Sequence, residues 1–229
     1  MKYGEIIRGQ FCKRMNRFIA EVIIEDQIER VHIKNTGRLK ELFLPDADVL
    51  LERSKNPERK TKFSLIAVNK QGQWVNIDSQ APNKVAFEAL LEGKISELGN
   101  VSTLKREVTY GASRFDLYFE QGEQKGFIEV KGVTLERDGI AMFPDAPTTR
   151  GTKHVLELAK AVQEGYSCTI LLVVQLKGCE YFVPNRETDP KFADALLFAA
   201  QAGVQILAYD TIVKEDEMIL NRAIPVHLS

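Results

Sequence analysis

Two short apolar runs, each interrupted by charged residues, constrain the fold more than any other feature. Residues 115–119 hold Asp116 between hydrophobic neighbours, and residues 127–131 hold Glu129 and Lys131 two positions apart. Because side chains alternate along a strand, Glu129 and Lys131 would project from one face. The polar, glycine-containing segment between the runs can fold them into a hairpin. In that hairpin, Asp116 would lie opposite Glu129 or one step away.

Such a hairpin would place two carboxylates and an ammonium on one patch of an apolar surface. Burying these charges costs free energy unless the carboxylates meet a cation, and carboxylates together with waters are ligands that suit Mg²⁺. We therefore predict a Mg²⁺ or Mn²⁺ site with Asp116, Glu129 and the Val130 carbonyl as ligands, and with Lys131 as a catalytic group. The alternative is an edge hairpin whose exposed face carries Asp116, Glu129 and Lys131 as cross-strand ion pairs.

A helix predicted over residues 83–91 offers one more carboxylate. Glu88 is the expected catalytic carboxylate from this helix, and Glu97 is the second choice. The alternative for Glu88 is an exposed position on an amphipathic helix.

A second group of polar residues surrounds the start of another predicted helix. The prolines of residues 143–154 make a stiff loop, and Thr148 or Thr149 can cap the helix that follows. Asp145 is expected to act as a cap rather than join the metal ligands.

The same helix start predicts an anion site. Its free amides, together with Arg150 and Lys153, suit a phosphate group. His154 could bond a phosphate or a metal-bound water; the alternative is a histidine that is packed or hydrogen-bonded inside the fold.

Many short strands in the first third of the chain predict a small antiparallel barrel. The expected strands are residues 3–8, 18–24, 30–33, 49–52, 64–69 and 74–77.

Charge is unevenly divided along the chain. Residues 1–80 hold 15 Lys and Arg against 11 Asp and Glu, a net charge of +4, while the whole chain has −1. This asymmetry favours a first half that faces a polyanion. We expect Arg14, Arg17 and Arg38 to contact phosphates. Two aromatic side chains could be stacking platforms for bases, although their apolar surroundings favour core positions; these are Phe18 and Phe43.

From residue 82 onward the pattern becomes a mixture of helices and strands. Residues 168–176 form a continuous apolar run, which indicates a strand buried on both faces. A helix predicted over residues 152–164 precedes it, as expected of a right-handed crossover. The predicted fold class is therefore an all-β barrel followed by an α/β domain with a mixed sheet. The remaining expected elements are strands 104–110, 114–119 and 126–135, helix 190–202 and strand 204–209.

Composition excludes several classes of protein. No apolar run is long enough to span a bilayer, so no membrane partner is expected. The three cysteines lack a metal-binding spacing, which favours a cytoplasmic protein with free thiols. The sequence is also compatible with a homo-oligomer.

The order helix, three strands, helix, strand resembles the core of the PD-(D/E)xK nuclease superfamily. Almost the whole chain also resembles the sugar fermentation stimulation protein A family of prokaryotes. That resemblance rests on residues 14–18, 35–37, 95–98, 127–133, 143–146 and 149–154. It implies an OB-fold over residues 1–80, a nuclease-like domain over residues 81–229, DNA as the partner and a role in regulating sugar use.

We expect a DNA-binding protein that is a divalent-metal-dependent phosphodiesterase, because Asp116, Glu129 and Lys131 are all present. The alternative is a non-catalytic DNA-binding regulator of sugar-utilisation genes that retains the nuclease fold. A third interpretation is an RNA or nucleotide phosphodiesterase.

Overall fold

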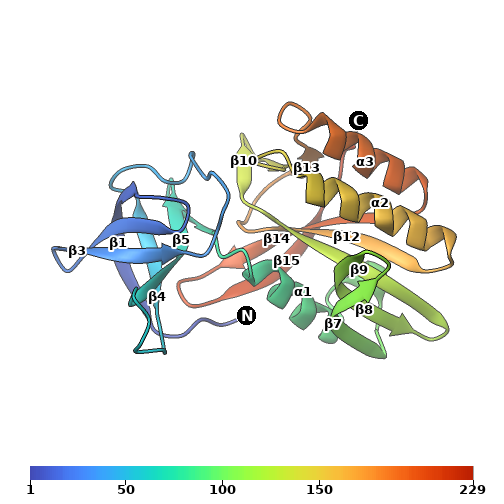
Figure 1. Ribbon diagram of the computed structural model, residues 1–229, viewed down its shortest axis with the longest axis horizontal. Helices are drawn as coiled ribbons and strands as arrows, with labels where there is room; N and C mark the ends of the chain where they lie inside the picture. Colours follow the sequence, from blue (N-terminus) through green and yellow to red (C-terminus); the bar gives the residue numbers. More distant parts are fainter. Residues whose placement is uncertain (229) are drawn as a thin grey trace.

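Five strands near the N-terminus close into a barrel in the computed structural model, which describes residues 1–228 (Figure 1). They follow the order β3-β2-β1-β4-β5, and pairing of β3 with β5 completes the circle. Burial alternates along β2, so that Ala20, Val22 and Ile24 fill the barrel interior. The predicted OB-fold is confirmed. Its strands, with β6 added beside β5, are β1 (Ile6–Arg14), β2 (Ile19–Ile24), β3 (Gln27–Ile33), β4 (Asp48–Arg53), β5 (Phe63–Lys70) and β6 (Gln73–Asn76).

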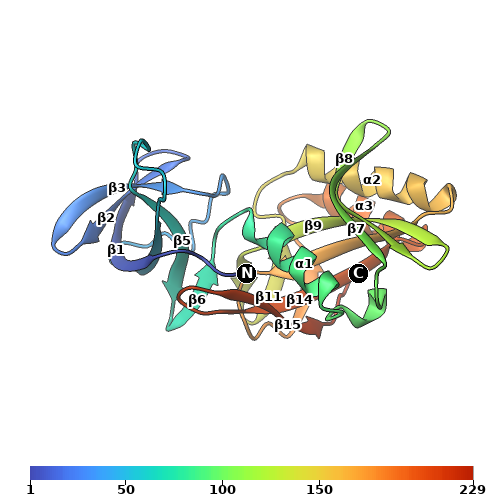
Figure 2. The same ribbon diagram turned by 90° about the horizontal axis from the view of Figure 1, so that it is seen from below.

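The first barrel strand begins later than residues 3–8 had suggested. Lys2 forms an antiparallel bridge with Glu217, and the Tyr3 amide donates to the Asp216 carbonyl over 2.8 Å. The first residues therefore add to the second domain, and the chain enters the barrel only at Ile6 (Figure 2).

A mixed six-stranded sheet forms the centre of the second domain, in the order β15-β14-β12-β9-β8-β7. Strand β12 is parallel to both of its neighbours, and the other pairings are antiparallel. Its residues are buried on both faces, as the continuous apolar run predicted. The strands are β7 (Thr103–Tyr110), β8 (Ser113–Gln121), β9 (Gln124–Val133), β12 (Ser167–Val174), β14 (Gln205–Val213) and β15 (Met218–Ile224).

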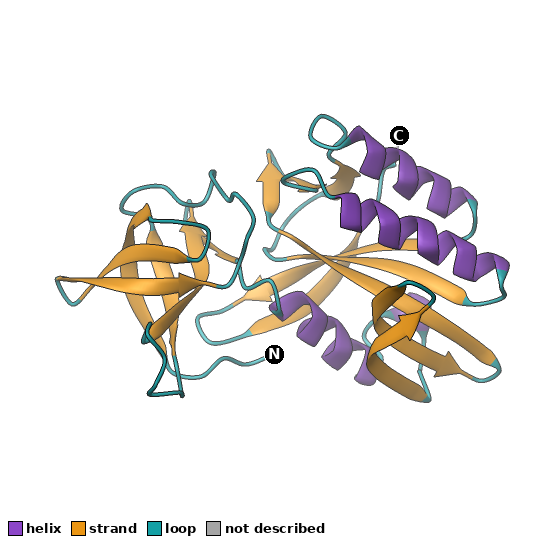
Figure 3. Cartoon of the chain, in the orientation of Figure 1, coloured by secondary structure: helices purple, strands orange, loops and turns teal. Residues whose placement is uncertain are grey.

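Helices cover both faces of this sheet (Figure 3). Helix α1 (Ala81–Leu91) lies on one face, where Val85 packs in the same cluster as Leu171 and Val173 of β12. Helices α2 (Thr149–Gln163) and α3 (Pro190–Gln201) lie on the other, in the cluster of Ile170 and Leu172. Alternate residues of one central strand thus serve the two faces, which follows from strand geometry.

Several short elements were not predicted. They are the 3₁₀ helix η1 (Ser96–Leu98), the last strand β15 and a small sheet of β10 (Leu135–Arg137), β11 (Ile140–Phe143) and β13 (Tyr181–Pro184). Within residues 1–228, no helix is both long and apolar enough to cross a membrane.

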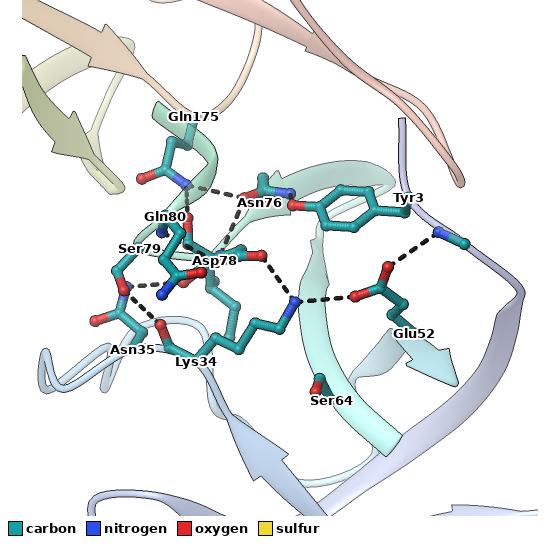
Figure 4. Close-up of polar contacts among 12 residues, drawn as sticks. Tyr3, Lys34, Asn35, Glu52, Ser64, Asn76, Asp78, Ser79, Gln80 and Gln175 are labelled. Atoms are coloured by element: carbon teal, nitrogen blue, oxygen red, sulfur yellow. Dashed lines mark hydrogen bonds and ion pairs between the residues drawn. The ribbon is translucent and has the colours of Figure 1, made fainter. Parts of the chain in front are cut away.

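Polar side chains at the junction link the two domains (Figure 4). Gln175, just beyond β12, donates from Nε2 to Asn76 Oδ1 over 2.9 Å and to the Asp78 carbonyl over 3.2 Å. The Lys34 ammonium lies 2.9 Å from Glu52 Oε2 and 3.2 Å from Asp78 Oδ2. Because these groups are largely buried and paired, they fix the barrel against the α/β domain.

Candidate functional site

The predicted hairpin is formed by β8 and β9. Leu117 pairs with Ile128, and the same register continued by one residue places Asp116 opposite Glu129. The hairpin is not at an edge of the sheet on the β9 side, because β12 pairs with β9 along its length. The alternative of solvent-exposed ion pairs is therefore wrong for Glu129, whose residue surface is 2% exposed.

The two oxygens of Glu129 have different surroundings. Oε1 accepts hydrogen bonds from Lys131 Nζ at 2.6 Å and from His154 Nδ1 at 2.5 Å. Oε2 is buried, and among residues 1–228 it has no hydrogen-bond partner. A buried polar oxygen without a partner costs about 1–3 kcal/mol, and more when it is charged. One oxygen of Glu129 is thus held in place while the other is left for an additional group.

Asp116 lies where the ladder between β8 and β9 ends. Its Oδ2 accepts the Val130 amide over 2.9 Å, and its Oδ1 accepts Asn83 Nδ2 of α1 over 2.7 Å. Each carboxylate oxygen keeps one further lone pair. Within a strand residue, the amide and carbonyl point to the same side, so the Val130 carbonyl also faces β8.

The pKa values of the two carboxyls are shifted in opposite directions. Burial raises the pKa of Asp116, and the negative charge of Glu129 raises it further, against the weaker effects of the Val130 amide, Lys131 and Asn83. Burial also acts to raise the pKa of Glu129, but His154 and Lys131 outweigh burial and lower it. A buried and a half-buried carboxyl with pKa values pushed apart are typical of a functional site.

His154 is buried and holds Glu129 rather than pointing to solvent. Arg150 Nε donates to His154 Nε2 over 3.5 Å, while Nδ1 of the same ring faces Glu129. The expected contact with a phosphate or a metal-bound water is therefore indirect, because His154 acts through Glu129.

Helix α2 is capped by Thr148, one of the two predicted candidates. Thr148 Oγ1 accepts the Gly151 amide over 3.0 Å. Asp145, which was expected to cap a helix, instead accepts the Arg38 amide of the barrel over 3.1 Å. Lys153 is exposed, and its ammonium donates to the Ala112 carbonyl over 3.1 Å.

Neither predicted additional carboxylate reaches the hairpin site. Glu88 pairs with the Met1 ammonium at 2.7 Å, and Glu97 accepts the Tyr209 hydroxyl at 2.6 Å. Asn83 takes the position expected of Glu88. Five residues along a helix correspond to a rotation of about 140°, so a helix that presents Asn83 to Asp116 turns Glu88 away.

Arg14 is a structural cross-link. All five N–H donors of its guanidinium meet backbone carbonyls, which leaves none for a phosphate. The acceptors, at 2.7–3.2 Å, belong to Asn16, Arg17, Asn35, Gly37 and Arg38. Arg17 and Arg38 are exposed, as is Arg150.

The two aromatic candidates of the barrel differ from each other. Phe43 stacks on Phe11 with centroids 5.0 Å apart, which agrees with the expected core position. Phe18 was also expected in the core, but half of its surface is exposed (50%). It lies just before β2, at the end of the barrel, where an inward orientation is no longer required.

The hairpin offers a small set of donor atoms to a metal ion. Within residues 1–228, no group of three His, Cys, Asp or Glu side chains is placed to hold one. The available donors are two carboxylates and a carbonyl, all of them oxygens. This set fits a hard cation that keeps several waters, as Mg²⁺ does.

The closed barrel joined to a mixed-sheet domain with a buried carboxylate hairpin defines the class: an OB-type domain followed by an α/β domain. The family model for the SfsA N-terminal OB domain matches residues 12–77. The family model for the sugar fermentation stimulation protein RE domain matches residues 80–217. The chain therefore belongs to the sugar fermentation stimulation protein (SfsA) family.

Relatives match over the full length. The sugar fermentation stimulation protein homolog of Alkaliphilus oremlandii is 54% identical, covering 99% of this chain and 98% of that protein. The homolog of Clostridium beijerinckii is 48% identical over 100% of both. A solved structure of Pyrococcus furiosus SfsA in complex with Ca²⁺ has a TM-score of 0.90 and 30% identity, covering 99% of this chain and 98% of that one.

Proposed function

We propose that the protein is a DNA-binding, divalent-metal-dependent phosphodiesterase with its centre at the hairpin of β8 and β9. The unpartnered Oε2 of Glu129, together with the half-buried Asp116 carboxylate on the neighbouring strand, whose pKa is raised, carries the proposal. The two carboxylates repel each other, and a bound divalent cation would relieve the part of this repulsion that Lys131 leaves. The Ca²⁺ complex of the Pyrococcus furiosus relative supports a cation that prefers oxygen ligands.

In this proposal, Asp116, Glu129 Oε2 and the Val130 carbonyl hold Mg²⁺ or Mn²⁺. The ion would supply Lewis-acid polarisation of a phosphate oxygen and a more acidic water. His154 keeps the Glu129 carboxylate in one orientation. Lys131, whose ammonium is 2.6 Å from Glu129 Oε1, adds positive charge where a phosphate would gain negative charge.

A non-catalytic DNA-binding regulator is the second candidate. Two observations favour it. Lys131 is hydrogen-bonded to Glu129, and the hairpin site holds only a small number of carboxylates. The family name, which refers to sugar fermentation, is compatible with either function.

Metal binding is tested by calorimetric titration with Mn²⁺. Asp116→Asn should lower the affinity at least tenfold, because an anionic ligand is replaced by a neutral one of the same shape. Glu88→Gln is the matched control: its carboxylate pairs with Met1, so affinity should be unchanged. Equal Mn²⁺ affinity in wild type and Asp116→Asn would overturn the metal site.

Catalysis is tested separately with single-stranded, duplex and branched DNA in Mg²⁺ or Mn²⁺. Lys131→Ala should abolish cleavage yet keep most DNA affinity, since one lysine supplies only part of the backbone electrostatics. If wild-type protein binds DNA but cuts none of these substrates, the regulatory function is the correct one.

A further inference from the structure

A hollow on the barrel combines an exposed aromatic ring with cations. Phe18 comes from the loop between β1 and β2, and Arg59 from the loop between β4 and β5. These correspond to the two loops that bind oligonucleotides in OB-folds generally. The volume is about 480 Å³, within the range of roughly 300–1,000 Å³ for ligand sites. This barrel hollow is lined by, among others, Phe18, His32, Lys34, Asn35, Thr36 and Arg59.

The chemistry of the barrel hollow suits a nucleotide. Phe18 is 50% exposed, so its ring is available for stacking rather than packed in the core. Arg59 donates to Ser64 Oγ over 2.9 Å, the one side-chain hydrogen bond it makes within residues 1–228, and keeps its other donors for an anion. Burial, together with the charges of Arg59 and Lys34, lowers the pKa of His32. His32 is therefore a neutral hydrogen-bonding group near pH 7.

A second hollow, of about 300 Å³, lies at the domain junction. The two share Asn35 and Thr36. Its lining also includes Gly132 of β9, which faces Gln175 and Pro82, and Pro147, which precedes the cap of α2. The two hollows, which border the same loop, define a candidate path from the exposed ring of Phe18 to the domain junction.

The loop that joins the hollows is held from both sides. Arg14 binds its carbonyls, and Asn35 Nδ2 donates to the Ile77 carbonyl over 2.9 Å. Ser79 Oγ donates to the Lys34 carbonyl over 2.6 Å (Figure 4). Because this loop is fixed before any ligand arrives, the path is preorganised, which lowers the entropic cost of binding.

We propose that this path binds an unpaired nucleic-acid strand, with one base stacked on Phe18 and the strand crossing Thr36 towards Glu129. In a duplex the bases are already stacked on each other and paired, so an isolated aromatic platform selects an unpaired base. The inference rests on the proposed nucleic-acid function and adds to it the substrate class: single strands, or duplexes with a single-stranded tail.

Binding is measured in EDTA by fluorescence anisotropy, so that cleavage plays no part. Phe18→Ala should weaken binding of a single-stranded 12-mer by roughly 5- to 100-fold, and Phe18→Trp should retain it. Duplex binding should not change. Phe198→Ala is the matched control, because Phe198 is 52% exposed on α3. A 2-aminopurine base should lose its stacking signal in Phe18→Ala only.

The crossing at Thr36 is tested with Thr36→Glu against Thr36→Gln, which have similar size but different charge. The glutamate variant should bind the 12-mer several-fold more weakly at low salt, through repulsion of the phosphates, and the difference should shrink as salt is added. Equal binding by the two variants would show that the strand does not cross this loop.

The outcomes separate the two proposals. Single-strand binding that depends on Phe18 without any cleavage supports the path and rejects catalysis. Metal-dependent cleavage with unchanged affinity in Phe18→Ala supports catalysis and rejects the path. Wild-type protein that binds no nucleic acid would overturn both.

Discussion

At the residue scale, the raised pKa of Asp116 means that the folded protein binds this proton more tightly than the unfolded chain does. Protonation of Asp116 therefore stabilises the fold as the pH falls through its raised pKa, and that contribution is absent at higher pH. Glu129, with its lowered pKa, has the opposite dependence. The charge on ionised Asp116 is thus unfavourable to the fold, as charges in functional sites often are.

We predict that Asp116→Asn stabilises the metal-free protein by about 1 kcal/mol at pH 8. The gain should shrink as the pH is lowered from 8 into the acidic range, through the raised pKa of the wild-type Asp116 carboxyl. Asn83 can reverse its amide to accept from the new side chain. Thermal unfolding in EDTA across this pH range measures the effect, and added Mg²⁺ should stabilise wild type alone. A variant less stable than wild type at pH 8 would contradict this account.

Two neighbouring arginines should behave differently. Arg14→Ala removes five charge-assisted hydrogen bonds and should cost roughly 2 kcal/mol or more of unfolding free energy. Arg14→Lys should not restore it, since an ammonium lacks the planar fork. Arg17→Ala, at an exposed position, should stay within about 0.5 kcal/mol. Urea unfolding of the three variants measures these losses. Equal losses of unfolding free energy in Arg14→Ala and Arg17→Ala would contradict the structural role of Arg14.

At the scale of elements, α2 positions His154, and its start depends on the Thr148 cap. Loss of the cap should loosen the first turn, which carries Arg150, before it affects the rest of the helix.

Thr148→Ala should therefore destabilise the protein by about 1 kcal/mol, while Thr148→Ser, which keeps the hydroxyl, should be close to wild type. Hydrogen exchange should quicken in the first turn of α2 and leave α3 unaffected. Unchanged protection of the Gly151 amide in Thr148→Ala would show that the cap bond is unimportant.

Local sequence patterns predicted most helices and strands well, but they did not predict which face each helix presents to the site. The hairpin of Asp116 and Glu129 follows from a period of two, which has only two phases, so the facing carboxylates could be recognised. A helical side chain can point in many more directions than a strand side chain, because each residue turns the helix by about 100°. The sequence could not show that α1 presents Asn83 rather than Glu88, although the polar residue in the first turn after Pro82 was a usable signal.

At the scale of the whole molecule, the junction depends on contacts between residues distant in sequence, such as Gln175 and Asn76. No local pattern predicts them, and for the same reason the exposure of Phe18 could not be predicted. We expect the two domains to unfold together, because Gln175 is buried and satisfies groups of the linker between them.

Trp74 is the sole tryptophan of the chain and lies in β6, so its fluorescence reports on the barrel side. In wild type its urea transition should coincide with that of circular dichroism. Gln175→Ala should lower the unfolding free energy by about 1–3 kcal/mol and separate the two transitions. Gln201 is exposed, so Gln201→Ala should have neither effect. Separate transitions already in wild type would mean that the junction does not couple the domains.

Residues 1–3 are made before the barrel strands but pair with residues 216–218, where β15 begins. The barrel has all of its strands once Asn76 has emerged, so it can close while synthesis continues. The α/β domain must wait for β14 and β15, and until then the first residues have no partner strand. In the growing chain, the barrel hollow would therefore be complete before the domain that carries Glu129 is closed.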